Sequence, residues 1–417
     1  MITKRKLFLP YKILIALYLF FIVTAFFVDS PSEILTGLKS IILTPDILIT
    51  DYISIGGIGA TLINAALTSL ISILILYLLG IKPNGSTIMA LWLMTGFSFF
   101  GKNILNIWPV MFGVYLFSKY QKTPLLNYAL VMILSTTLAP TVSQLRFTSN
   151  NILLGSLGGG LIGVLIGFIL APIAAHCISS HGGYNLYNIG FASGLLATLL
   201  MSVFRFLGID FETQLIWSTG NNKFFLSFMI IICLYLIGVG IYFGRDIKTN
   251  LTKINKQSGK LVSDFYLLFG NSTYINMGVI GLFSTFYLVL IGGDINGPTI
   301  GGLFTIIGFG CFGKHLLNIF PVMLGATIGA AISVFNITDE GILLAILFST
   351  CLAPIAGKFG WKIGIITGML HVALVSNVGY LHGGLNLYNN GLAGGFVAMI
   401  ILPIITTFKR EVRTDEI

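Results

Sequence analysis

Long continuous runs of apolar residues organise this chain. Ten of them approach the roughly 20 apolar residues that a membrane-spanning helix needs. They are residues 11–28, 52–80, 124–143, 151–178, 186–206, 222–244, 273–292, 341–357, 361–380 and 387–407. The strands of an outer-membrane barrel would instead alternate over about ten residues. The pattern therefore predicts an all-α polytopic membrane protein.

Two further apolar stretches, 85–118 and 297–335, are each interrupted in the middle by a Gly-Lys pair. Each stretch is either a re-entrant hairpin of two half-helices or two short spans, and both options return the chain to the side it left. We expect about five spans plus one interrupted segment in each half of the chain. Counting the interrupted stretches as full spans gives the alternative, 7+7 spans.

Composition agrees with this class. Charged residues are 9% of the chain, against about 25% in soluble domains, and the mean hydropathy is +0.95. The four cysteines lie in apolar runs without the spacing of a metal site, so we expect no metal, no cofactor and no disulfide framework. The net charge of +9 could suggest nucleic acid, but the basic residues mark one face of a membrane, and we expect no such partner.

The charged residues alternate between the connections. Most Lys and Arg fall at the two termini and in short connections, above all in residues 245–260, whereas Asp29, Asp46, Asp294 and Asp339 fall on the opposite side. The positive-inside rule then places both termini in the cytoplasm, as in a multi-pass protein of a bacterial cytoplasmic (plasma) membrane. We expect residues 11–28 to be retained rather than cleaved as a signal peptide, because residues 222–244 head the second half of the chain in the same way.

Internal duplication is the most informative feature. Residues 96–113 read GFSFFGKNILNIWPVMFG and residues 308–325 read GFGCFGKHLLNIFPVMLG, while HGGYNLYNIGFASG (181–194) matches HGGLNLYNNGLAGG (382–395). We predict two membrane repeats, 1–210 and 211–417. An odd number of spans in the first repeat inverts the second, and in such folds solutes bind near the midplane between the repeats.

These paired blocks resemble an uncharacterised family of duplicated bacterial membrane proteins, classed as a domain of unknown function. The resemblance covers nearly the whole chain and implies a polytopic membrane protein, without an activity. More faintly, five-plus-five inverted spans with two re-entrant elements are similar to the urea transporters, which are trimers with a narrow pore, although their Asn-Pro signature is absent here. The 7+7 alternative would look like the uracil-permease and sulfate-transporter architecture.

The Gly-Lys interruptions carry the first candidate site. A lysine within apolar sequence is costly and usually faces a cavity or a partner, so Lys102 and Lys314 predict a cationic centre, with half-helix N-termini adding positive potential. The alternative is that each lysine lies in a surface loop. Gly101 and Gly313 would let the backbone approach a ligand. Four polar residues follow at helical spacing and are candidate ligands of the same solute: Asn103, Asn106, His315 and Asn318.

The HGG blocks carry the second candidate site. Their Gly-rich turns, which include Gly183 and Gly384, need positive φ. Four amides follow on one helix face and suit a neutral polar solute or a carboxylate: Asn185, Asn188, Asn386 and Asn389. Capping and helix–helix hydrogen bonding are the alternative roles. The spacing of Gly190 and Gly194 predicts helix packing, as does that of Gly391 and Gly395.

The function predicted from these observations is transport of a small polar, preferably anionic, solute, by a secondary transporter or a channel with its site between the repeats. A urea-like neutral solute is the alternative. The HExxH and GxSxG motifs and paired buried carboxylates are absent, so we expect the protein not to be an enzyme. A membrane-embedded enzyme or scaffold is the remaining class. The lipid bilayer and the solute are the expected partners, and a coupling ion and a homo-oligomer stay open.

Overall fold

The computed structural model describes residues 8–211, 214–261 and 263–411, which are almost entirely helical. Ten of the described segments are long and apolar enough to cross a membrane, which confirms the predicted class. Eight spans are each built on one long helix, of which α3 is kinked at Gly57 (φ +82°). They are α1 (Leu9–Val28), α3 (Tyr52–Leu78), α8 (Ile152–Ser180), α9 (Asn188–Phe206), α10 (Asn222–Phe243), α13 (Thr273–Leu290), α18 (Trp361–Val378) and α19 (Asn389–Glu411). The basic residues before Phe8 and after Glu411 lie outside the described residues.

Two spans are broken at matching positions in the two halves. Residues 125–148 form η1 (Leu125–Tyr128), α6 (Ala129–Leu134), η2 (Ser135–Leu138) and α7 (Ala139–Thr148); residues 340–359 form α16 (Glu340–Phe348), η4 (Ser349–Leu352) and α17 (Ala353–Phe359). Pro140 and Pro354 each stand in the first turn of the helix after the break. Because proline lacks an amide hydrogen, it is tolerated there and not in a continuous helix.

The remaining elements are shorter. They are α2 (Pro31–Leu43), α4 (Gly85–Phe97), α5 (Ile107–Tyr120), α11 (Ile247–Ile254), α12 (Phe265–Phe269), η3 (Gly270–Ser272), α14 (Gly297–Phe309), α15 (Leu316–Ala331) and η5 (Gly379–His382). Strands β1 (Ile49–Thr50) and β2 (Leu215–Ile216) pair in parallel and connect the two halves of the chain.

Each interrupted stretch forms two half-helices. Helices α4 and α14 have 13 residues each, which is about 20 Å at 1.5 Å per residue and short of the roughly 30 Å of a hydrocarbon core. The break follows at Gly101 (φ +82°) and Gly313 (φ +109°), where a positive φ favours glycine. The lengths favour the re-entrant interpretation over two full spans.

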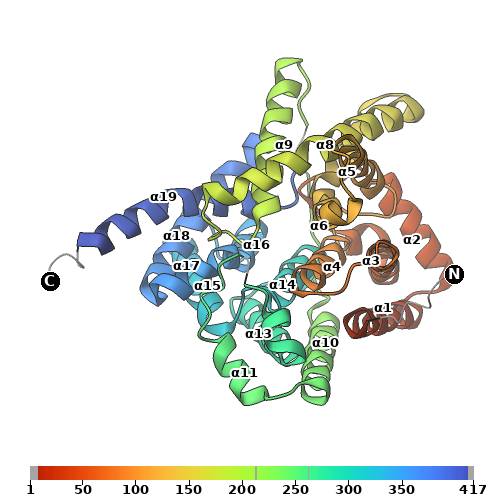
Figure 1. Cartoon of the computed structure of the whole chain (residues 1–417). Helices are drawn as coiled ribbons and strands as arrows, with labels where there is room; N and C mark the ends of the chain where they lie inside the picture. Colours follow the sequence, from red (N-terminus) through yellow and green to blue (C-terminus); the bar gives the residue numbers. More distant parts are fainter. Residues whose placement is uncertain (1–7, 212–213, 262, 412–417) are drawn as a thin grey trace.

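Helices α4 and α14 lie side by side near the centre of the molecule (Figure 1). They are antiparallel: Gly96 contacts Gly301, and Trp92 contacts Gly308. The start of each helix meets a carboxylate of the other half. Asp264 accepts hydrogen bonds from the Gly85 amide at 2.9 and 3.0 Å, and Asp51 accepts one from the Gly297 amide. Anions at a helix N-terminus are stabilising, so these contacts hold the halves together.

A second contact between the halves joins α9 and α19. Gly190 lies against Gly391, and Gly194 lies against Leu392. Small residues let two helix backbones approach closely in a membrane. The predicted packing role of these glycines is confirmed.

Candidate functional site

Each buried lysine bonds to a tyrosine of the other half. Lys102 Nζ donates to Tyr388 Oη at 3.1 Å, and Lys314 Nζ donates to Tyr187 Oη at 2.7 Å. Lys314 also donates to Thr350 Oγ1 at 2.7 Å. The tyrosines belong to the NLYN segments of the two HGG blocks, so the structure joins the two candidate sites. We call these four residues the Lys–Tyr pairs.

Aromatic rings, and not carboxylates, surround the lysines. Lys102 Nζ lies 5.3 Å from the ring centre of Phe97 and 5.0 Å from that of Tyr388. Lys314 Nζ lies 4.9 Å from that of Phe309 and 4.7 Å from that of Tyr187. Both lysines are fully buried, and the only ion pair among the described residues is Arg205–Asp210 at the surface. A desolvated cation gains from aromatic faces, but nothing here neutralises its charge.

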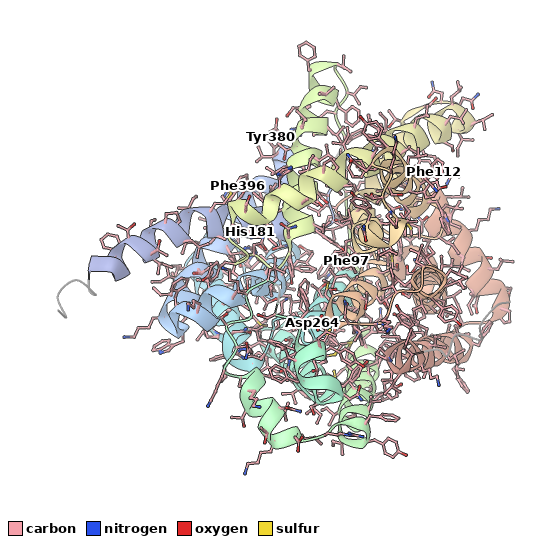
Figure 2. The ribbon with its side chains drawn as sticks, viewed as in Figure 1. Phe97, Phe112, His181, Asp264, Tyr380 and Phe396 are labelled. Carbon is pink, nitrogen blue, oxygen red and sulfur yellow. The ribbon has the colours of Figure 1, made fainter. Side chains whose placement is uncertain are left out.

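The lysines lie at the C-terminal ends of half-helices. Lys102 follows α4 and its amide bonds to the Phe97 carbonyl; Lys314 follows α14 and its amide bonds to the Phe309 carbonyl. The negative end of that helix dipole favours each cation. The half-helices α5 and α15, whose N-termini the sequence predicted to add positive potential, begin after the lysines, at Ile107 and Leu316. Figure 2 shows Phe97, beside Lys102, near the middle of the molecule.

A narrow cavity separates the two tyrosines. It has a volume of about 10 Å³ and is lined by Tyr187, Tyr388, Phe97, Phe348, Leu93, Thr305, Leu387 and Asn390. That volume approaches the minimum for one water molecule. Neither lysine lines this cavity, so a solute in a widened cavity would meet the tyrosine side chains before the lysines.

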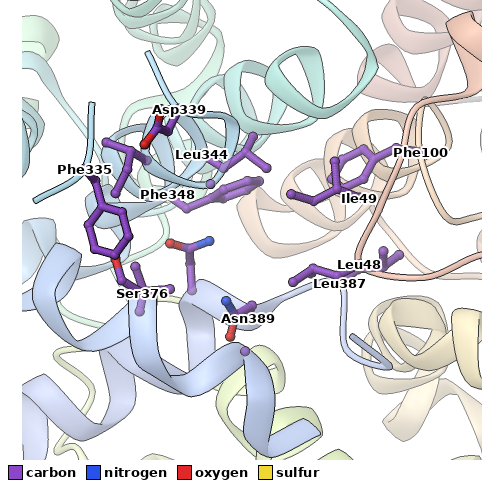
Figure 3. Close-up of a pocket in the computed structure, with 15 residues that line it drawn as sticks. Leu48, Ile49, Phe100, Phe335, Asp339, Leu344, Phe348, Ser376, Leu387 and Asn389 are labelled. Atoms are coloured by element: carbon purple, nitrogen blue, oxygen red, sulfur yellow. The ribbon is translucent and has the colours of Figure 1, made fainter. Parts of the chain in front are cut away.

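A larger cavity, which we call the vestibule, lies next to the narrow one. Its volume is about 330 Å³, and it shares Phe348, Leu387 and Asn390 with the narrow cavity. Figure 3 shows Asn389 and Phe348 on its walls and Phe335 at one side. Phe335 is exposed, so the vestibule opens beside the connection that carries Asp339, on the side where the sequence placed its acidic residues.

Asn103 and Asn106 do not face the Lys–Tyr pairs. Their side-chain amides donate to Asp46 Oδ2 at 3.2 and 3.0 Å, and each caps a backbone amide of the other. They line a separate cavity of about 250 Å³ with Arg146. Asp46 is fully buried in the connection between α2 and α3, and Tyr52 Oη also donates to it at 2.8 Å. Burial raises the pKa of Asp46 to about 7.

The matching residues of the second half are also structural. Asn318 Oδ1 accepts from the His315 amide at 2.9 Å, and its side-chain amide donates to the Gly313 carbonyl at 2.9 Å. His315 Nε2 lies 2.8 Å from the Gln257 carbonyl. Together with Asn103 and Asn106, these side chains shape the turns that hold the lysines, and the structure does not bring them to the narrow cavity.

The amides of the HGG blocks divide into two groups. Asn185 donates to the Gly391 carbonyl, Asn386 donates to the Gly190 carbonyl, and Asn188 donates to the Ala174 carbonyl. These three link helices. Asn389 differs, because its Oδ1 lies 2.8 Å from His382 Nε2 while its amide group has no hydrogen-bond partner among the described residues and lines the vestibule. Gly183 (φ +79°) and Gly384 (φ +77°) have the predicted positive φ.

Sequence reasoning missed the partners of the lysines. Tyr187 and Tyr388 were part of the HGG blocks, and their matching positions were the available signal. The charge pattern of the sequence placed Asp46 in an outer connection. Its burial against Asn103 is a contact between residues distant in the sequence, which a local pattern does not predict. Among the described residues there is no group of His, Cys, Asp or Glu that could hold a metal ion, and all four cysteines are free.

The sequence model of one family matches the chain over residues 30–206 and 244–407. The chain belongs to this family, which is described as protein of unknown function DUF1576. No significant match was found among curated proteins or among solved structures. The likeness to urea transporters therefore rests on the organisation of the sequence alone.

Proposed function

We propose that this membrane protein transports a small anionic solute between its two halves. The observation that carries the proposal is the set of Lys–Tyr pairs: two desolvated cations from matching positions, facing each other's half, with no carboxylate at either. An isolated charge buried in protein or lipid costs several kcal/mol. An anion between the pairs would offset part of that cost for both lysines at once.

The tyrosines would make the direct contacts. Each phenol oxygen accepts a hydrogen bond from a lysine. The Tyr388 hydrogen is left to donate, and that of Tyr187 has only a long contact, 3.5 Å, with Thr350 Oγ1. Hydrogen bonds to ionised groups are about twice as strong as neutral ones. Two such donors on opposite walls of the narrow cavity suit a carboxylate or an inorganic oxyanion.

Access from the two sides would alternate. The vestibule is large enough for a small solute and ends at Phe348, Leu387 and Asn390, beyond which the cavity is about 10 Å³. This arrangement supports a state open toward the acidic side and closed at the tyrosines. The protein would act in a bacterial plasma membrane with both termini in the cytoplasm, as the distribution of basic residues favours.

Uptake into proteoliposomes tests the proposal. The panel is acetate, inorganic phosphate and sulfate beside neutral urea, each with and without Na⁺ and pH gradients. We expect uptake of an anion and its loss by at least about 100-fold in Lys102→Met/Lys314→Met, because the anion loses the two positive charges that lie next to its tyrosine donors. Lys119→Met, at an exposed lysine of α5, is the matched control and should transport normally.

Two results would overturn the proposal. Anion uptake that is unchanged in the double variant would remove the charge role of the lysines. Gradient-independent flux of urea alone would make the protein a urea-like neutral channel and reduce the lysines to structural groups.

A further inference from the structure

The second half alone presents free amide groups to the vestibule. Asn389 and Asn390 both line it and are each about nine-tenths buried, with exposed fractions of 8%. Neither side-chain amide nitrogen has a hydrogen-bond partner among the described residues. In the first half, Asn188 matches Asn389, but its amide group is occupied by the Ala174 carbonyl at 2.9 Å, and Ile189 stands in place of Asn390.

A buried histidine orients each of these amides. His371 Nε2 lies 2.9 Å from Asn390 Oδ1, and His382 Nε2 lies 2.8 Å from Asn389 Oδ1. A carbonyl oxygen only accepts, so each histidine donates from Nε2. The oxygen of each amide is therefore held by protein, and its –NH₂ group is left for the vestibule.

The His371–Asn390 pair has no polar equivalent in the first half. Gly167 of α8 and Gly368 of α18 make the same contacts, with the carbonyls of Val110 and Val322. This fixes the alignment of the two helices, and three residues later Leu170 matches His371. The two halves thus differ as a pair: His371 with Asn390 in one, Leu170 with Ile189 in the other. Because the histidine is present only in the half that has the asparagine, we infer that His371 orients Asn390.

We propose that Asn389 and Asn390 form the entry site of the vestibule, where their two –NH₂ groups bind the oxygens of an incoming carboxylate or oxyanion, and that His371 is the positioning residue of Asn390. The entry site rests on the proposed transport function and adds its recognition step. It adjoins the narrow cavity directly, because Asn390 lines both spaces. A solute held there lies next to Tyr388, the neighbouring residue in the chain.

The test replaces the polar pair with the apolar pair of the first half. His371→Leu/Asn390→Ile uses residues that the same backbone already accommodates, so folding should survive. We expect the KM for anion uptake to rise about tenfold, the effect of losing one hydrogen bond to a charged group, with kcat nearly unchanged. Asn377→Ile is the matched control, because Asn377 is an exposed asparagine of the same helix, α18.

The positioning role has its own measurement. His371→Gln keeps an N–H donor toward Asn390 Oδ1 and should restore most of the affinity, whereas His371→Leu should not. Equal KM values in these two variants would remove the positioning role, and a KM of wild-type value in the double variant would overturn the entry site. The lysine double variant, measured alongside, distinguishes this failure from that of the transport proposal.

A binding assay covers the case in which no probe is transported. Asn390→Cys should react with a membrane-impermeant thiol reagent from the vestibule side, against a low background because the four native cysteines are buried. Acetate, phosphate or sulfate should slow that reaction several-fold, and urea should slow it less. An unreactive Cys, or a reaction that none of the anions slows, would overturn the proposal.

Discussion

The two segments that cover the Gly-Lys turns follow the same path but hold their turns by different means. Residues 44–48 lie between Asn103 and Gly384, and residues 257–261 lie between Gly313 and Gly183. In the first half a buried side chain, Asp46, makes the contact, whereas in the second half main-chain atoms do: the Gln257 carbonyl meets His315, and the Leu261 amide donates to the Gly183 carbonyl.

This comparison distinguishes the feature that both halves share, a segment that covers the turn, from the side chains that differ between them. Both turns require a covering segment, because α4 and α14 end before Gly101 and Gly313 and leave backbone groups to be bonded. Only the first half adds a buried carboxylate to that cover, because the ionisable group of the second segment, Lys260, is exposed. The two ends of the proposed solute path therefore differ in charge chemistry although their backbones match, and each difference can be tested by substitution.

Removing Asp46 should have the largest effect on stability. In Asp46→Ala the buried donors of Tyr52, Asn103 and Asn106 lose an acceptor. We expect a loss of about 3 kcal/mol or more, because each unsatisfied buried donor costs about 1–3 kcal/mol. Gln257→Ala keeps its main-chain carbonyl and should cost less than about 0.5 kcal/mol. Apparent melting temperatures in detergent at one heating rate measure both, and equal losses would contradict the comparison.

The Lys–Tyr pairs should differ in the same assay, with a smaller effect. Tyr388→Phe leaves Lys102 without a hydroxyl acceptor, whereas Tyr187→Phe leaves Lys314 bonded to Thr350. A buried donor without a partner costs about 1–3 kcal/mol, and more when it is charged. We therefore expect Tyr388→Phe to melt at a lower temperature than Tyr187→Phe, and the reverse order would show that the Thr350 contact contributes nothing.

Asp46 should also make the stability of the protein depend on pH, with a smaller change per pH unit than the substitutions above cause. Its pKa is raised to about 7 by burial, against about 3.9 in an unfolded chain. Between these values the folded protein binds the proton more tightly, so stability falls as pH rises from about 4 to 7, by at most about 1.4 kcal/mol per pH unit.

Asp46→Asn supplies the control for this pH dependence. It keeps the side-chain volume and removes the titration, so its melting temperature should vary less over that range than that of the wild type. A wild-type protein whose melting temperature rises over the same range would contradict the assignment.

Much of the fold could be predicted from apolar periodicity, because a membrane helix must satisfy its backbone within itself. The ten spans, the breaks at Gly101 and Gly313 and the close packing of Gly190 on Gly391 all follow from local pattern. The pairing of Lys102 with Tyr388 could not be predicted in this way. The two residues are far apart in the chain, and their contact depends on how the turn after α4 meets the segment before α19. The burial of Asp46 could not be predicted for the same reason. A polar connection between two spans is expected at the surface, and its contact with the Gly-Lys turn is visible only in the structure.

Because each buried lysine bonds to a tyrosine of the other half, the partners of a pair are not made at the same time. Lys102 enters the membrane long before the ribosome has made Tyr388, and Tyr187 is likewise made before Lys314. During that interval a desolvated ammonium group has no hydroxyl acceptor of its own half, at an insertion cost of about 2.5–3.5 kcal/mol. The first half is thus incomplete during synthesis, and we expect the insertion machinery to keep Lys102 away from lipid until the second half is inserted. A chain stopped before Tyr388 should be a preferred target of membrane quality-control proteases.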